Sequence, residues 1–286
     1  FAGRGVKILG PGSLTILNIS LAKYMPSGIR TGRHGMYGGD LWIKDGASIS
    51  VKISNGNAIA VDNNCTLTVE SSSVATWSGI DRGFISVTEL ATGGGRAGDV
   101  NFVGSIIIDS SYSGAHAGGN LTITGSYCTF LNEYNCLGSP NLTINDSVIN
   151  AYSAKDGVVW AADQMVGEDR LFLGRGLYRL ATGAESQYAI GGNRIVIDGA
   201  NIACCTPGGM GVSFGNDCAF KSGSLRMVSD MDVSDGFAFD TLISAAEGTL
   251  SSWRSIANGD AFYAAAYSGA MDLIKSFFVG DPSGKP

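Results

Sequence analysis

Apolar and polar residues alternate in short runs along most of the chain, and these runs repeat. The clearest run is Asn120-Leu121-Thr122-Ile123-Thr124, and a close copy follows at 141–145 (NLTIN). The two leading leucines, Leu121 and Leu142, lie 21 positions apart (142 − 121 = 21). A period of two predicts a half-buried β-strand. A strand that recurs at this spacing predicts a solenoid, in which each unit buries its apolar face against its neighbours.

Looser copies of the apolar pair follow one another at intervals of 21 to 33 residues. We predict that they form one ladder, with a faint last copy near Ala219: Leu14/Ile16, Leu41/Ile43, Leu67/Val69, Val100/Phe102, Leu121/Ile123, Leu142/Ile144, Leu171/Leu173 and Ile195/Ile197. A second short strand follows most copies after a Gly or Asp corner, and a third segment precedes them. Three short strands and three corners per turn indicate an all-β fold, a single-stranded right-handed parallel β-helix of about nine coils and roughly 40 Å in length.

An antiparallel sandwich or barrel is the main alternative fold, because it also has many short strands and Gly-rich turns. Asn-Gly pairs, which are strong hairpin signals, occur only at Asn55-Gly56 and Asn258-Gly259. The corner residues also stay in phase with the repeat, as at Asp45-Gly46 and Asp146-Ser147. The pattern therefore favours the solenoid.

The repeat divides the chain into a β-helix over residues 1–240 and a capping segment with a linker over 241–286. Between Asp260 and Phe278, apolar residues recur at helical spacing, which predicts a helical cap over the open edge of the last coil. The chain begins at Phe1 without a methionine, so we expect a processed piece of a longer multidomain or surface-assembled protein.

Composition narrows the classes of partner. Of 286 residues, 42 are glycine and 15% are charged, as expected of a corner-rich solenoid. The formal net charge of −6 disfavours binding to nucleic acid. No run of about 18 apolar residues is present, so we expect no membrane span.

Six cysteines are present, and none has the Cys-x-x-Cys spacing of a zinc site. In the phase of the repeat, Cys128 and Cys204 fall on inward positions, which predicts thiols that fill the core. A disulfide from Cys204 or Cys205 to Cys218 is possible in an oxidising compartment, and the sequence does not assign it.

Exposed aromatic residues on a flat ridge would suit the C–H faces of sugar rings. Trp42 and Phe172 occupy the outward position between the apolar pairs, and Trp160 lies in an insertion at 151–170. The alternative is that loops cover these rings. Asn120 and Asn141 occupy equivalent corners of adjacent coils, where they would offer amides to a sugar or hydrogen-bond to each other.

Acidic residues suggest a metal site near the end of the repeat. Asp230, Asp232 and Asp235 resemble a calcium-binding loop, because calcium takes several carboxylate oxygens from one turn, although the spacing departs by one residue from the strict motif. Asp163, Glu168 and Asp169 form a second acidic cluster. Solvated corner carboxylates are the simpler interpretation of both.

A lyase would need a base, usually Arg or Lys, near the acid group of its substrate. The cations gather loosely in two places: Arg30, Arg33, Lys44 and Lys52, and then Arg170, Arg175 and Arg179. His34 and His116 are the only histidines, and a lone histidine is more often structural than catalytic. The sequence shows no local signature of a catalytic base.

Residues 189–202 (AIGGNRIVIDGANI) and 119–126 (GNLTITGS) resemble the secreted bacterial β-helix proteins that carry carbohydrate-binding domains, which are relatives in fold of the pectate lyases. The resemblance covers roughly residues 13–240. It implies an extracellular or cell-surface protein, often calcium-bearing, that binds plant-type or acidic polysaccharides. We therefore predict a non-catalytic polysaccharide-binding protein. The alternatives are a polysaccharide lyase on the same scaffold and a structural or adhesive surface or fibre protein.

Overall fold

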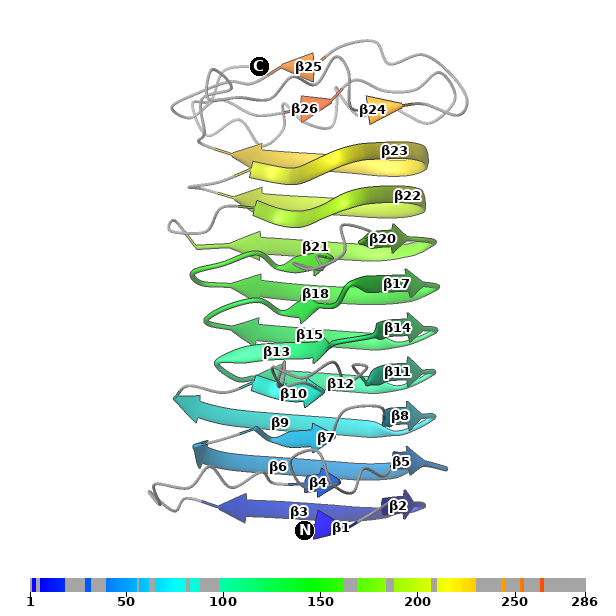
Figure 1. Cartoon of the computed structure of the whole chain (residues 1–286), viewed down its shortest axis with the longest axis vertical. Helices are drawn as coiled ribbons and strands as arrows, with labels where there is room; N and C mark the ends of the chain where they lie inside the picture. The colour runs from blue at the N-terminus through cyan, green and yellow to red at the C-terminus, as the bar shows by residue number, and fades with distance from the viewer. Residues whose placement is uncertain are drawn as a thin grey trace, which may run out of the picture.

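The structure, a computed structural model, describes residues 2–3, 6–18, 29–31, 40–55, 57–61, 65–80, 83–87, 98–161, 169–183, 188–206 and 210–229, and the pairs 243–244, 253–254 and 263–264. These residues form strands and turns and contain no helix. The strands of successive coils pair in parallel and stack along the long axis of the molecule (Figure 1). The predicted all-β parallel solenoid is confirmed.

The first ladder of the solenoid contains the strands whose pattern predicted the fold. Leu121 pairs with Leu142, and Ile123 with Ile144, as the repeat requires. The ladder consists of β2 (Val6–Leu9), β5 (Leu41–Lys44), β8 (Thr66–Glu70), β11 (Asp99–Val103), β14 (Asn120–Thr124), β17 (Asn141–Asn145), β20 (Arg170–Leu173) and the middle parts of β22 (Tyr188–Thr206) and β23 (Met210–Ser229).

The prediction for the first ladder is wrong at its two ends. Leu14 and Ile16 pair with Ile49 and Val51 in the second ladder, and it is Val6 and Ile8 that pair with Leu41 and Ile43. The corner before Gly12 separates two strands that each carry an apolar pair, so the pattern fits both. At the other end, Cys218 pairs with Ile195, which places Ala219 in the outward column and Phe220 in register with Ile197.

Two further ladders complete each coil. The second contains β3 (Gly12–Asn18), β6 (Ala47–Asn55), β9 (Ser73–Ile80), β12 (Ile106–Ser110), β15 (Tyr127–Asn132), β18 (Ser147–Ser153), β21 (Gly176–Thr182) and the last parts of β22 and β23. The third contains β1 (Ala2–Gly3), β4 (Ile29–Thr31), β7 (Ile59–Val61), β10 (Gly83–Val87), β13 (Ser113–Ala117), β16 (Leu137–Gly138), β19 (Val159–Ala161) and the first parts of β22 and β23.

The core is a stack of like side chains inside the coils. Leu121, Ile123 and their partners in the next coil are all at most 1% exposed. Cys128 and Cys204 lie in this core as predicted, and Cys136 joins them. These three thiols are free, so Cys204 forms no bridge to Cys218. Burial raises the pKa of each of them, which keeps them protonated and unreactive.

The corner between the first and second ladders combines a left-handed residue with a buried serine. Asp146 has φ 49°, and Asp45, Ser71, Gly104, Gly125 and Gly199 take positive φ at the same place in their coils. The next residue in four coils is a serine: Ser72, Ser105, Ser126 and Ser147. Each of the last three accepts a hydrogen bond from the backbone N–H of the serine in the preceding coil, at 3.3, 3.1 and 3.1 Å. This serine ladder satisfies backbone donors inside the corner.

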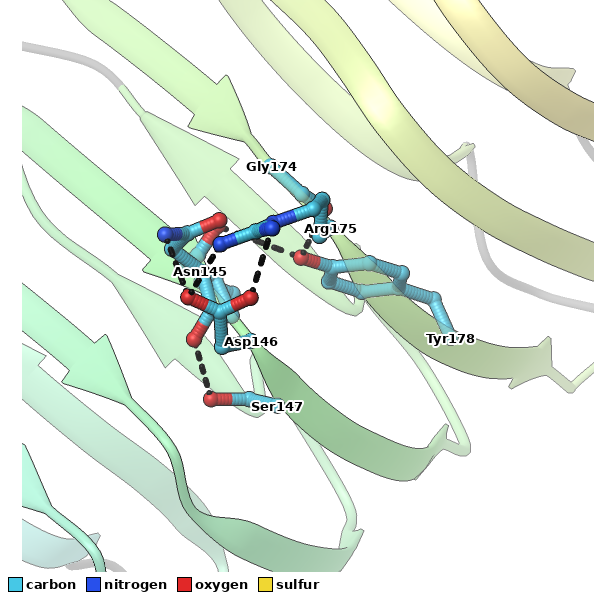
Figure 2. Close-up of polar contacts among 7 residues, drawn as sticks. Asn145, Asp146, Ser147, Gly174, Arg175 and Tyr178 are labelled. Carbon is cyan, nitrogen blue, oxygen red and sulfur yellow. Dashed lines mark hydrogen bonds and ion pairs between the residues drawn. The ribbon is translucent and has the colours of Figure 1, made fainter.

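Figure 2 shows the same corner where it meets an exposed ion pair. Arg175 Nε lies 2.9 Å from Asp146 Oδ1, and Ser147 Oγ donates to the carbonyl of Asn145 at 2.7 Å. The fully buried Tyr178 donates its hydroxyl to the carbonyls of Gly174 and Ile144, at 2.9 and 3.2 Å. Because of this burial the pKa of Tyr178 is raised, so the hydroxyl stays a donor.

Beyond β23, β24 (Ile243–Ser244) continues the first ladder. The helix predicted over Asp260–Phe278 is wrong at the two positions that the structure describes there. Tyr263 and Ala264 form β26 (Tyr263–Ala264), which pairs antiparallel with β25 (Trp253–Arg254). Trp and Tyr favour strands, and the pairing satisfies backbone groups that a helix would have satisfied internally. The rest of the expected cap lies outside the described residues.

Candidate functional site

The three aromatic residues predicted to bind a ligand do not form one surface. Trp42 in β5 and Phe172 in β20 share the outward column of the first ladder, but they are five coil spacings apart, or ~24 Å. Trp160 in β19 belongs to the third ladder. All three side chains are half-buried.

Trp42 already has a partner within the chain. Lys7, which pairs with Trp42 in the adjacent coil, lies with Nζ 5.1 Å from the centroid of the Trp42 ring. Trp42 stays half-buried beside this cation, and among the residues whose burial the structure describes the first ladder has no strongly exposed aromatic side chain.

Asn120 and Asn141 lie in register in adjacent coils, but their side-chain amides do not hydrogen-bond to each other. Asn120 instead bonds to Asp99 in the coil before it, with Nδ2 and the backbone nitrogen at 3.0 and 2.7 Å from Asp99 Oδ1. The backbone of Asn141 is held by Ser139 Oγ, and its side chain is exposed. The Asn120 amide is therefore committed to the ladder, whereas the Asn141 amide faces solvent.

The predicted calcium ligands Asp230, Asp232 and Asp235 lie outside the described residues, as do Asp163 and Glu168. Asp169 is buried, and its Oδ2 accepts a hydrogen bond from Asn193 Nδ2 at 3.0 Å. Within the described part of the chain, no three His, Cys, Asp or Glu side chains lie close enough together to hold a metal ion. Nor does any helix in that part have the length and apolarity needed to cross a membrane.

The cations that a lyase would use are distributed over separate parts of the surface. Arg170 is exposed on the first ladder, Arg175 pairs with Asp146 at the corner, and Arg179 is exposed on the second ladder. His116 lies over Gly138, with Nε2 3.3 Å from the carbonyl of Asn135, and burial lowers its pKa. This environment is structural, as expected of a lone histidine.

Most of the strongly exposed apolar side chains gather on the second ladder, away from the residues that were predicted to bind a ligand. Six of the eight large hydrophobic residues that are strongly exposed in the described chain lie there: Trp77 (39%), Ile106 (49%), Ile108 (48%), Tyr127 (48%), Leu131 (54%) and Tyr152 (40%). Contiguous exposed apolar surface of this kind marks interaction sites in soluble proteins.

We name this surface the second-sheet face. It consists of the outward side chains of β6, β9, β12, β15, β18 and β21. These strands lie one above another (Figure 1). Its outward positions form three columns: Ser48, Ser73, Ile106, Tyr127, Val148 and Leu177; Ser50, Ala75, Ile108, Thr129, Asn150 and Arg179; Lys52, Trp77, Ser110, Leu131, Tyr152 and Ala181.

A line of polar contacts crosses three coils of the second-sheet face. Asn150 Nδ2 donates to the Tyr127 hydroxyl at 3.1 Å, and Arg179 Nη1 donates to Asn150 Oδ1 at 3.1 Å. These contacts fix the phenol, the amide and the guanidinium relative to one another. The face thus presents an oriented aromatic ring beside an amide and a cation.

A polar network lies directly beneath this face. Asp109 is fully buried, and its Oδ1 accepts hydrogen bonds from Thr76 Oγ1 and Ser111 Oγ at 2.7 and 2.6 Å. Asn132 Nδ2 donates to Asp109 Oδ2 at 2.7 Å. Burial raises the pKa of Asp109 to about 6, although the hydrogen bonds oppose the shift. The network is inaccessible to a ligand.

The sequence contains a signal for the second-sheet face in the second strand of each coil, whereas Trp42 and Phe172 were predicted from the first strand. In the second strand, Tyr127, Thr129 and Leu131 alternate with Cys128 and Phe130, which marks them as outward.

Comparison with known proteins identifies no relative of this chain: no family model matches it, and no curated protein or solved structure shows significant similarity to it. The resemblance to carbohydrate-binding β-helix proteins therefore stays a prediction.

Proposed function

We propose that the chain is a non-catalytic polysaccharide-binding β-helix and that the second-sheet face holds the polysaccharide. The observation that carries this proposal is the exposed Tyr127 ring, whose hydroxyl is held by Asn150. An extended glycan offers apolar C–H faces and hydroxyl groups, which aromatic rings and amides bind together. Because neighbouring side chains already orient the ring, binding would cost little side-chain ordering.

The dimensions of the second-sheet face support the same proposal. The coils repeat every ~4.8 Å, a distance close to the length of one sugar unit in an extended glycan. Aliphatic, aromatic and hydroxyl side chains therefore recur along the long axis at the spacing of the sugars. An extracellular or cell-surface location belongs to this proposal, because that is where most long polysaccharides occur.

The proposal is tested by native affinity electrophoresis in gels that contain polygalacturonate, alginate, xylan or mixed-linkage glucan. We expect at least one polysaccharide to retard the wild type, and Tyr127→Ala to lose roughly tenfold in affinity because it removes the stacking ring. Trp42→Ala is the matched control, since it removes an aromatic residue from the first ladder. Melting curves of both variants confirm that they fold.

Three outcomes would contradict the proposal. If no polysaccharide retards the wild type, the chain does not bind these glycans and a structural or adhesive role is favoured. If Trp42→Ala abolishes retardation and Tyr127→Ala does not, the first ladder is the binding surface. If incubation yields unsaturated or shortened products, the protein is a lyase or hydrolase.

A further inference from the structure

We infer that the glycan on the second-sheet face carries carboxylate groups and spans at least about six sugar units, with Arg179 binding an acid group at one end and Lys52 at the other. This inference rests on the proposed function, and it adds the charge and the minimum length of the ligand.

The charges of the chain are unevenly distributed over its surface. The sequence has 25 acidic and 19 basic residues, yet the outward positions of the second-sheet face include Lys52 and Arg179 and no Asp or Glu. Asp109 lies in these strands but points inward and is fully buried. Two of the exposed acids that flank these strands are paired within the chain: Asp146 with Arg175 at the corner before β18, and Glu133, directly after β15, with Lys155. A face whose outward strand positions include cations and no acid suits a partner of opposite charge.

Arg179 is arranged to bind a carboxylate. Its side chain is exposed, and it forms one hydrogen bond to Asn150 Oδ1 through Nη1. A guanidinium has five N–H donors, so two parallel donors remain that can bind a carboxylate in a bidentate manner. Within the described residues Arg179 pairs with no carboxylate of the chain. Since Asn150 also holds Tyr127, an acid group bound to Arg179 would lie beside the sugar that stacks on Tyr127.

Lys52 provides a second cation at the opposite end of the face. Its Nζ lies 5.1 Å from the centroid of the Trp77 ring, so a cation again stands beside an exposed aromatic residue. From β6, which carries Lys52, to β21, which carries Arg179, there are five coil spacings, or ~24 Å. The outward positions between them are apolar or uncharged. A single glycan that reaches both cations therefore needs about six units.

The inference is tested with oligogalacturonides and alginate oligomers of two to eight units, each paired with its carboxyl-reduced form, in calorimetric titrations. We expect affinity for the acidic oligomers to rise with length up to about six units, and the reduced forms to bind roughly tenfold more weakly. Arg179→Gln should lose a similar factor on acidic oligomers and nothing on reduced ones. Lys52→Gln should weaken only the oligomers long enough to reach it.

Arg170→Gln is the matched control, because it removes the same charge from the exposed surface of the first ladder. Equal affinity for acidic and reduced oligomers would overturn the inference and leave the proposed function standing. So would retardation by neutral xylan or glucan without binding of either acidic series. If none of the acidic or neutral glycans binds, the proposed function fails and this inference fails with it.

Discussion

Asn150 donates a hydrogen bond to the Tyr127 hydroxyl across the boundary between two coils, and the distance is 3.1 Å. The two residues are 23 positions apart in sequence. Arg179, in the coil after Asn150, completes the line at the same distance. These hydrogen bonds fix the orientation of three side chains on the second-sheet face. Oriented polar groups beside an aromatic ring distinguish a binding surface from a merely exposed one.

The first prediction concerns Asn150. Asn150→Ala removes the group that orients both Tyr127 and Arg179, so we expect affinity for the bound glycan to fall about fivefold. The side chain lies on the surface, so the free energy of unfolding should change by less than about 0.5 kcal/mol. Calorimetric titration and chemical unfolding measure the two effects. Asn101→Ala, on the outward column of the first ladder, is the control and should change neither the affinity nor the free energy of unfolding. Unchanged affinity in Asn150→Ala would show that the contacts among Tyr127, Asn150 and Arg179 do not position the ligand.

The sequence predicts the solenoid because its inward residues are constrained. Leu121 and Leu142 each fill the same place in successive coils, so chemically similar residues recur and the period can be read. The prediction fails at Leu14 because Val6 and Leu14 each begin an apolar pair within the same coil. Periodicity shows that a strand is half-buried, but it does not show which of three ladders the strand joins.

The binding face is harder to predict because outward positions have few constraints. Tyr127, Asn150 and Arg179 have unrelated side chains, and their contacts depend on register and on rotamers. Alternation identifies each of them as outward, but the sequence does not show that loops leave them exposed. The same limit applies to Trp42, whose contact with Lys7 follows from a register that the pattern left ambiguous.

The second prediction tests the serine ladder. Ser126 Oγ accepts from the backbone nitrogen of Ser105 at 3.1 Å and donates to the Thr124 carbonyl at 3.0 Å, in a buried corner. Ser126→Ala leaves the Ser105 N–H without its partner and should destabilise the fold by about 1 to 3 kcal/mol. The midpoint of chemical unfolding measures the loss. Ser50→Ala, at an exposed position, should shift the midpoint little; equal shifts in the two variants would refute a special role for the buried serine.

The third prediction concerns Gly176, which occupies the corner position next to Ser147 in the following coil. Its φ is +150°, and a Cβ there would overlap the carbonyl oxygen of Ser147. Gly176→Ala should therefore destabilise the solenoid by about 2 to 3 kcal/mol through strain and a shift of the corner. Gly12→Ala is the control, because a Cβ at Gly12 meets no atom within 4 Å. Thermal melting compares the two variants. Similar melting temperatures would show that the corner at Gly176 accommodates a Cβ without loss of stability.

The last prediction follows from the buried carboxyl group of Asp109, whose pKa is raised from its usual 3.8 to about 6 because burial disfavours the charged form. Between these two pH values the unfolded chain has released a proton that the folded chain still holds. The stability contributed by this group is therefore complete below about pH 4 and is lost as the pH rises to about 6. A shift of this size corresponds to about 3 kcal/mol.

Chemical unfolding from pH 3.5 to 7.5 tests this linkage, with Asp109→Asn as the informative variant. The amide does not ionise, so the variant should lose the decline in stability between about pH 4 and 6, even though its altered contacts with Asn132 lower stability at every pH. Glu133→Gln is the control, since Glu133 is an exposed partner of Lys155 whose removal should leave the wild-type profile nearly unchanged. If the free energy of unfolding depends on pH in the same way for the wild type and Asp109→Asn, the Asp109 carboxyl group has the same pKa in the folded and unfolded states. The assignment of the pH dependence to Asp109 would then be wrong.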